Sequence, residues 1–287
     1  MVGLGRRFSR KEVLERLWKT VKLGKPILGA GCSVGLVAKC AEIGGADLII
    51  AYSTGLSRIK GLPTTLFGPM DSNAVTLSMF EELDNVVKET PIIGGVDASD
   101  PTCLDLKKLI MKFLDVGFSG IINFPTMGLF GDREPASRYR ISRDSQGLGW
   151  IREVELMRRA REMGVFTMAY VFNPEDAEDM AKVPVDVLVA HVGGTSGGLA
   201  GFKAKPLQEA AEAVQKIVEA AKAINPRLIC LAHGGPFADP EDTKYLYLHT
   251  DVVGFVGASS IERIPIEKAV TDVVRRFKSY SLKQWLA

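Results

Sequence analysis

Apolar residues along the chain follow two alternating patterns. In the first, short apolar runs are bounded by glycine, proline or polar residues, which is typical of strands buried on both faces. Eight such runs follow one another along the chain: Pro26–Ala30, Ala46–Ala51, Ile92–Val96, Gly120–Asn123, Phe166–Val171, Val185–His191, Leu228–His233 and Val252–Val256.

The second pattern is the helical spacing of apolar residues between these runs. Asx-Pro pairs at Asp100-Pro101, Asn173-Pro174 and Asp239-Pro240 predict three helix starts, because the polar side chain caps the helix and proline is tolerated at its first position. A further helix is predicted over residues 9–22, before the first strand, where Ser9 and Glu12 form a capping box. The last apolar stripe is made by Ile266, Ala269, Val270, Val273, Val274 and Phe277.

These patterns predict an α/β protein of the (β/α)8 TIM-barrel type, with an extra N-terminal helix. Eight strand–helix units across residues 26–280 give about 32 residues each, the size of a βα repeat. The alternative is an open doubly wound sheet. We predict a helical extension at residues 1–25 and one barrel domain at residues 26–287. The extension covers the bottom of the barrel or forms an oligomer contact, because its apolar face must be buried.

Composition limits the classes of partner and cofactor. Lys and Arg number 36 and Asp and Glu 34, so the net charge of +2 favours neither a nucleic-acid nor a membrane partner. The four cysteines lack zinc-site spacing and the three histidines share no helix turn, so no zinc is expected. No nucleotide or haem is expected either. With no signal-peptide pattern and no 18-residue apolar stretch, we expect a cytoplasmic protein.

The predicted barrel brings the strand ends together at one rim, where the active sites of such barrels lie. His191 and His233 end the sixth and seventh predicted strands and are candidates for general acid or base. Asp97 follows the third strand and is a candidate base or divalent-cation ligand. The alternative for the histidines is packing against neighbouring loops. The third histidine, His249, is expected on the surface.

Glycine-rich strand ends are candidates for anion binding, because successive backbone N–H groups without side chains can hold an anion. The alternative is that these glycines only make tight turns. Two long connections, 53–70 and 125–148, add Arg58, Lys60, Arg133, Arg138, Arg140 and Arg143, which suggest an anionic ligand or a solvated charged loop. The candidate phosphate-binding residues are Gly193, Gly194, Thr195, Gly234, Gly235, Gly257, Ser259 and Ser260.

Segments at five strand ends resemble the phosphoenolpyruvate hydrolase-like TIM-barrel family, also described as TIM-barrel signal-transduction-like proteins. The resemblance extends over nearly the whole chain. It is carried by residues 26–31 (PILGAG), 51–55 (AYSTG), 94–97 (GGVD), 191–195 (HVGGT) and 233–236 (HGGP).

A more distant resemblance is to the phosphoenolpyruvate mutase and isocitrate lyase superfamily, whose enzymes break or move C–C and C–P bonds next to a 2-oxo acid. Residues 54–57 (TGLS) are similar to its substrate-binding Ser-Gly-Leu-Ser turn, so Ser53, Thr54 and Gly55 are candidates for substrate binding. The resemblance also implies that Asp97 falls where the superfamily holds Mg²⁺. It also implies a catalytic role for Asp71, which the local pattern alone explains as a helix cap. Two positions depart from that superfamily. Asn123 stands where it has an acidic metal-site residue, and Tyr170 stands where it has an arginine.

Two functional hypotheses follow. The first is a homo-oligomeric hydrolase or lyase that acts on a small anionic 2-oxo acid or enol phosphate of the phosphoenolpyruvate or phosphonopyruvate type, with Mg²⁺ as a candidate cofactor. The second is a non-catalytic regulatory or signal-transduction barrel that binds a metabolite. Schiff-base chemistry is disfavoured, because no lysine lies at a predicted strand end. Oligomerisation is expected from the apolar surface of the N-terminal helix and of Trp285 and Leu286.

Overall fold

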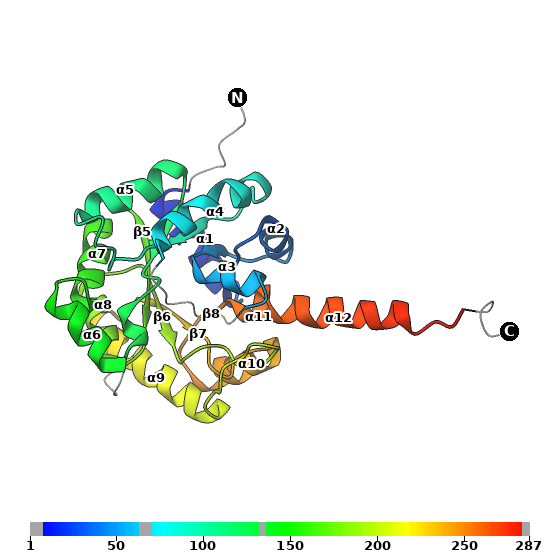
Figure 1. Cartoon of the computed structure of the whole chain (residues 1–287). Helices are drawn as coiled ribbons and strands as arrows, with labels where there is room; N and C mark the ends of the chain where they lie inside the picture. The colour runs from blue at the N-terminus through cyan, green and yellow to red at the C-terminus, as the bar shows by residue number, and fades with distance from the viewer. Residues whose placement is uncertain (1–7, 63–69, 132–135, 283–287) are drawn as a thin grey trace.

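The computed structural model describes residues 8–62, 70–131 and 136–282. Eight parallel strands pair in chain order and close into a barrel, which confirms the predicted TIM-barrel fold and excludes the open sheet (Figure 1). Each strand begins and ends within two residues of its predicted bounds. The strands are β1 Ile27–Gly31, β2 Leu48–Ala51, β3 Ile92–Gly95, β4 Gly120–Ile122, β5 Phe166–Val171, β6 Val187–His191, β7 Ile229–His233 and β8 Gly254–Gly257.

Helices connect these strands and surround the barrel (Figure 1). Short helices occupy several of the connections at the carboxyl ends of the strands, including parts of the two long connections that the sequence suggested were loops. The helices are α1 Arg10–Lys22, α2 Gly35–Ile43, α3 Thr54–Ile59, α4 Ser72–Val86, α5 Leu106–Val116, the 3-10 helix η1 Met127–Leu129, α6 Ala136–Ser145, α7 Trp150–Glu162, α8 Pro174–Lys182, α9 Leu207–Ile224, α10 Pro240–His249, α11 Ser259–Glu262 and α12 Ile264–Lys278.

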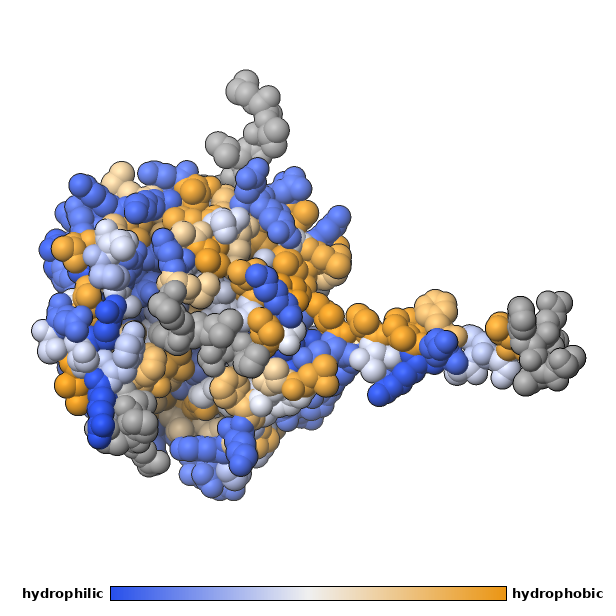
Figure 2. All heavy atoms as spheres, viewed as in Figure 1, coloured by the Kyte–Doolittle hydropathy of each residue, from blue (hydrophilic) through white to orange (hydrophobic). Residues whose placement is uncertain are grey.

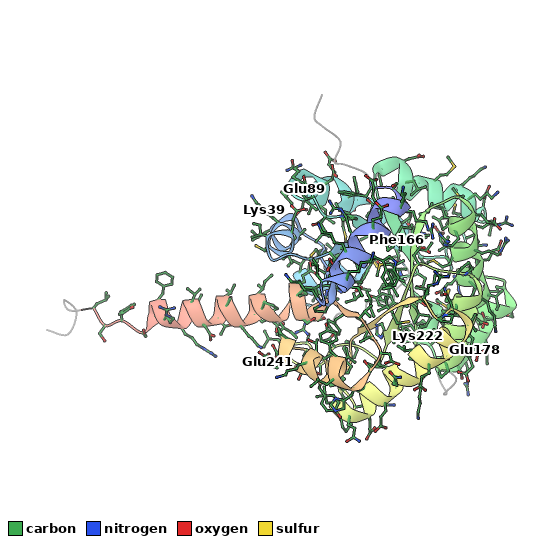
Figure 3. The ribbon with its side chains drawn as sticks, turned by 180° about the vertical axis from the view of Figure 1, so that it is seen from behind. Lys39, Glu89, Phe166, Glu178, Lys222 and Glu241 are labelled. Atoms are coloured by element: carbon green, nitrogen blue, oxygen red, sulfur yellow. The ribbon has the colours of Figure 1, made fainter. Side chains whose placement is uncertain are left out.

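Helix α1 closes the amino-terminal end of the barrel. Its buried residues Val13 and Leu17 join the cluster that fills the barrel interior, together with Phe166 at the start of β5 (Figure 3). Arg10 donates through Nε and Nη2 to Asp186, the residue before β6. The N-terminal helix therefore covers the barrel bottom, and the opposite rim stays available for a site.

Local capping signals predicted two of the three Asx-Pro helix starts correctly. Asn173 accepts a hydrogen bond from the backbone N–H of Asp176 and starts α8, and Asp239 starts α10. The prediction at Asp100-Pro101 is wrong. Asp100 accepts from the backbone N–H and hydroxyl of Thr102 in a turn, and Asp105 caps α5 instead. Both aspartates can cap a helix, and in the structure the helix starts after Asp105.

Helix α12 departs from the regular barrel, because it projects away from the body (Figure 1). Of its residues, only Ile264 is buried. The predicted apolar stripe is present, but it lies uncovered along this helix (Figure 2). Within the described ranges no helix has both the length and the apolar character needed to cross a bilayer.

Candidate active site

A cavity of about 310 Å³ opens at the carboxyl ends of the strands. Polar side chains reach it from β2, β6, β7 and β8, and an aromatic and aliphatic wall follows β4. The described residues that line it are Tyr52, Thr54, Arg58, Phe124, Leu129, Phe130, His191, Gly194, Thr195, Phe202, His233, Ala258 and Ser259.

The two histidines lie side by side at the inner end of this cavity. His191 and His233 are register partners on the neighbouring strands β6 and β7, and their ring centroids are 4.5 Å apart. Both are buried, at 5% and 6% exposure. Tyr170 on β5 packs against both rings, at 5.2 Å and 5.1 Å between centroids. The parallel register thus brings together two residues that are 42 positions apart in the chain (233 − 191).

Backbone partners give the two imidazoles opposite tautomers. The backbone N–H of Gly193 donates to Nδ1 of His191 at 3.1 Å, so this nitrogen is unprotonated and the neutral ring carries its proton on Nε2. His233 Nδ1 lies 2.7 Å from the carbonyl oxygen of Val256. A carbonyl only accepts, so Nδ1 of His233 holds the proton and Nε2 keeps a lone pair. One ring therefore offers a donor at Nε2 and the other a base.

Burial keeps both histidines neutral at neutral pH. Desolvation lowers the pKa of His233 to about 4, and the positive charge of Arg58 acts in the same direction. Desolvation also holds the pKa of His191 well below its usual value, with His233 as a second cause. In a pair of neutral imidazoles, one ring can donate a hydrogen bond to a developing oxyanion and the other can accept a proton. Neither ring has to gain or lose a proton before the reaction starts.

Arg58 supplies the cationic group of the cavity. It lies on α3 and lines the cavity, and its guanidinium lies 5.4 Å from the centre of the Tyr52 ring. Nε and Nη2 each lie 3.0 Å from Oε2 of the fully buried Glu262 on α11. The other oxygen, Oε1, accepts from the backbone N–H and the hydroxyl of Ser33 after β1. This network joins the connections after β1, β2 and β8 and fixes the guanidinium beside the cavity.

The structure brings together some of the residues predicted for the site. Six of them line the cavity: Thr54, His191, Gly194, Thr195, His233 and Ser259. Others lie around it rather than on its described wall: Ser53, Gly55, Gly193, Gly234, Gly235, Gly257 and Ser260. His249 lies exposed at the end of α10, as the sequence suggested.

Gly234 and Gly235 have a packing role that explains their residue type. Both have positive φ angles, 79° and 60°. The N–H of Gly235 donates to the carbonyl of Gly193 at 2.9 Å, and a Cβ on Gly234 would lie 2.0 Å from that same oxygen. These glycines allow the connections after β6 and β7 to touch, which positions the two histidines. The Gly235 N–H is committed to this bond.

Neither predicted aspartate lies on the cavity wall. Asp71 is exposed and caps α4 by accepting from the backbone N–H of Ala74 at 2.8 Å. Asp97 follows β3, and its Oδ1 accepts from the backbone N–H and the hydroxyl of Ser99 at 2.8 Å and 2.6 Å. Burial raises the pKa of Asp97, while its Ser99 hydrogen bonds oppose that rise.

Glu153 is a buried carboxyl group that the sequence analysis missed. It lies on α7 and is 1% exposed. Its oxygens accept from Nδ2 of Asn123 at 2.8 Å and from the backbone N–H of Met127 at 2.5 Å, and Thr126 Oγ1 lies 2.6 Å away. Desolvation raises the pKa of Glu153 to about 8, against these hydrogen bonds. The group thus holds the end of β4 and the start of η1, which carry the apolar wall. A glutamate in the first turn of a helix is common, so Glu153 gives no local sign of this role.

We expect Glu153→Gln to change the pH dependence of stability. The pKa of Glu153 is higher in the folded chain than in the unfolded chain, so the folded chain holds more protons. The stability due to this proton is therefore complete below the unfolded pKa of 4.5 and is lost as pH rises through about 8. In urea unfolding experiments across this pH range, the free energy of unfolding of the wild type should decrease as pH rises. The decrease should be smaller for the variant. Equal pH slopes for the two proteins would contradict this assignment.

Two of the other predicted arginines bind protein partners instead of lining the cavity. Arg140 pairs with Asp176 at 3.2 Å, and Arg143 donates to the carbonyl of Ser99. Arg133 lies outside the described residues. Among the described residues that line the cavity, Arg58 is the one with a formal charge. In the same part of the chain, no group of three or more His, Cys, Asp and Glu residues is arranged to hold a metal ion.

Comparison with known proteins agrees with the resemblance seen in the sequence. A family model described as phosphoenolpyruvate hydrolase-like matches residues 12–280. The chain belongs to this family. A tomato (Solanum lycopersicum) relative, the ToMV susceptible protein tm-1(GCR26), is 40% identical over 279 residues. That match covers 96% of this chain and 36% of the relative, so this member of the phosphoenolpyruvate hydrolase-like family spans about a third of that relative's length.

Solved structures of the mutase and lyase superfamily share the fold of this phosphoenolpyruvate hydrolase-like protein. Phosphoenolpyruvate phosphomutase from Streptomyces platensis subsp. rosaceus superimposes with a TM-score of 0.58 at 13% identity, covering 93% of this chain and 86% of that one. Phosphonopyruvate hydrolase in complex with oxalate and Mg²⁺ also gives a TM-score of 0.58, at 15% identity, covering 93% and 87%. At these low sequence identities, the similarity shows a shared barrel fold and nothing more.

Proposed function

We propose that this chain is an enzyme that binds a small anionic 2-oxo acid or enol phosphate and cleaves it by hydrolysis or by a lyase reaction. The observation that carries the proposal is the pair of neutral, oppositely protonated imidazoles in the same cavity as Arg58. Adjacent groups that can donate and accept a proton, together with a fixed cation, are the parts that such a reaction needs. The fold shared with phosphonopyruvate hydrolase is consistent with it.

Each group has a distinct role in this proposal. Arg58, held by Glu262, binds the substrate's anionic group through its guanidinium. His191 donates from Nε2 to the carbonyl oxygen and stabilises the negative charge that develops there. His233 accepts a proton at Nε2 from water or from a substrate hydroxyl, and its Nδ1–H remains bonded to Val256. This division of roles requires both rings to be neutral before the reaction.

Magnesium has no step in this proposal, because the donors near β3 and β4 do not fit it. Mg²⁺ requires oxygen ligands in octahedral geometry, with one or two of them from carboxylates. Asp97 lies off the cavity wall and already accepts from Ser99. Asn123 accepts from the backbone N–H of Tyr170 at 2.7 Å and donates to Glu153, so its amide is also engaged.

The test is turnover by the purified full chain with phosphoenolpyruvate, phosphonopyruvate and oxaloacetate, with pyruvate, phosphate and oxalate as readouts. We expect product release that EDTA does not change. Arg58→Lys retains a positive charge for Glu262 but loses the two-pronged guanidinium, and should lower kcat/KM about tenfold or more. Lys60→Met, an exposed neighbour, is the matched control and should leave the rate unchanged. Equal rates for Arg58→Lys and Lys60→Met would contradict the role of Arg58.

The second candidate function is a non-catalytic regulatory barrel that binds a metabolite. The observation that favours it is that Asn123 and Tyr170 are engaged in internal contacts. The resemblance to the mutase superfamily places these two residues where that superfamily has its acidic and arginine residues. Ligand binding without any product after long incubation would favour this second function over the enzyme.

We also propose that the protein forms a homo-oligomer through α12. Four apolar side chains on one face of this helix are 44–75% exposed: Val270, Val273, Val274 and Phe277. In a regular barrel the last helix packs on the outside of the sheet beside the first helix. The first helix of this barrel is α2, and its residues Leu36 and Ile43 are 74% and 77% exposed. A second copy of the chain could cover both surfaces. Around a two-fold axis, α12 of each copy would pack on α2 of the other copy.

We expect Val273→Glu to dissociate this oligomer. A charge in the centre of a buried apolar interface costs several kcal/mol, about enough to lower the affinity more than a hundredfold. Light scattering after size exclusion should give a multimeric wild type and a monomeric variant. Thr271→Glu adds the same charge on the polar face and should stay multimeric. A monomeric wild type at micromolar concentration would contradict the proposal.

A further inference from the structure

The cavity has two chemically different sides. Arg58 and Ser259 follow β2 and β8, and Glu262 pairs with Arg58 from behind. Phe124, Leu129 and Phe130 follow β4, two strands from β2. Because the eight strands close in chain order, β4 lies on the side of the barrel opposite β8. His191 and His233, on β6 and β7, lie between the charged side and the apolar side.

The charged side carries little net charge. The guanidinium of Arg58 is paired with Glu262 at 3.0 Å, and both side chains are at most 3% exposed. His191 and His233 are neutral at neutral pH. A phosphate dianion is usually held by several cations or N–H donors, whereas a single carboxylate is matched by one guanidinium. The described wall therefore suits a monoanion better than a phosphorylated acid.

The apolar side is a built surface. The Phe124 ring packs against the Tyr52 ring, with centroids 4.4 Å apart. Phe202 lies against Gly194, where a Cβ would come within 2.5 Å of the Phe202 ring. The backbone N–H of Phe202 donates to the carbonyl of Thr195 at 3.1 Å, which holds this connection over the cavity. Gly194 thus allows an aromatic ring to complete the wall beside the histidines.

We propose that the cavity selects a 2-oxo monocarboxylate with an apolar tail of several carbons. The proposal rests on the proposed function for its 2-oxo group and adds the class of substrate. The bond that breaks in such a substrate is C3–C4 of a 4-hydroxy-2-oxo acid: His233 takes the hydroxyl proton, the electron pair passes to the 2-oxo oxygen beside His191, and the products are pyruvate, after protonation of its enolate, and an aldehyde that carries the tail. The carboxylate pairs with Arg58, the 2-oxo oxygen accepts from Nε2 of His191, and the tail lies against Phe124, Phe130 and Phe202. The cavity of about 310 Å³ lies at the lower end of the range of small-molecule sites, about 300–1,000 Å³, and leaves room beyond a three-carbon acid.

The test is calorimetric titration of the wild-type chain with 2-oxo acids of increasing length, from pyruvate to 2-oxohexanoate, and with phosphoenolpyruvate. Each added methylene should raise affinity about fourfold, because each buried CH₂ contributes about 0.8 kcal/mol. Phosphoenolpyruvate should bind less tightly than 2-oxohexanoate. Affinities that do not rise with tail length, or tighter binding of phosphoenolpyruvate, would overturn the proposal.

Two variants separate the tail site from a general loss of folding. Phe202 is 37% exposed, so Phe202→Ala should leave the fold intact and reduce the gain per methylene. Leu199→Ala changes an 88% exposed residue of the same connection and should retain the full gain. A gain that Phe202→Ala leaves unchanged would count against this wall as the tail site.

The outcomes also distinguish this inference from the proposed function. Tail-dependent binding without product from phosphoenolpyruvate, phosphonopyruvate, oxaloacetate or a 4-hydroxy-2-oxo acid would support the tail site and contradict the enzyme. Turnover of phosphoenolpyruvate without tail-dependent binding would support the enzyme and contradict the tail site.

Discussion

His233→Asn should lower kcat about 100- to 10,000-fold, the contribution typical of a positioned general base. Asparagine keeps a donor near the position of Nδ1, so the hydrogen bond to the carbonyl of Val256 can persist. It removes the Nε2 lone pair, which the proposed reaction uses. The fold should therefore be retained while turnover is lost, as measured by circular dichroism and product release.

His191 provides the matched comparison, because its required group is a donor. Glutamine places an amide N–H near Nε2, so His191→Gln should retain more activity than His191→Leu. The opposite order would contradict the assigned tautomers. His249→Asn, far from the cavity at the exposed end of α10, should have the wild-type rate. A His233→Asn rate within about tenfold of the wild type would remove the base from the mechanism.

The pH dependence of the reaction rate should follow from the burial of His233. His233 must be unprotonated to act as a base, and its pKa is lowered to about 4. The rate should therefore stay level as pH falls below 6.5, the usual histidine value, and decline only towards about pH 4. The unfolded chain binds a proton on this histidine in that window, so stability also falls as pH falls through it.

Glu262→Ala should destabilise the fold by about 3–5 kcal/mol, because it leaves the buried charge of Arg58 without a partner. The backbone N–H of Ser33 would lose its acceptor as well, which adds to the cost. Urea unfolding measures the change. A loss below about 1 kcal/mol would show that the pair is solvated like a surface ion pair.

The double variant Arg58→Met/Glu262→Met tests the same pair without an unpaired charge. Two apolar side chains of similar size can replace a buried ion pair with little loss of stability. We therefore expect most of the stability to return while binding of the anionic ligand does not. Recovery of binding together with stability would show that Arg58 does not hold the ligand.

Local patterns in the sequence predicted most of the fold. Apolar runs located all eight strands, since a strand buried on both faces must be continuous in apolar residues. Ser9 and Asn173 marked two helix starts, because a cap depends on neighbours within one turn. Asp100 and Asp105 show where this fails, because both fit a cap and only the path of the chain selects one.

The candidate site was predicted in part, for a related reason. His191 and His233 were found because strand ends meet at one rim in any such barrel. Their tautomers depend on Gly193 and Val256, and the role of Glu153 depends on Asn123, so no local pattern contains them. Asp97 followed a strand as the histidines did, yet Ser99 draws its side chain into a turn off the cavity wall.

What the sequence determined by itself is the set of eight strands and the main helices between them, because hydrophobic periodicity and caps act over a few residues. What only the tertiary structure decided are contacts between distant positions. Arg58 and Glu262 are 204 residues apart and meet because β2 and β8 both adjoin β1 in the closed sheet. The apolar face of α12 was visible in the sequence, but its exposure depends on the direction in which the chain leaves the barrel.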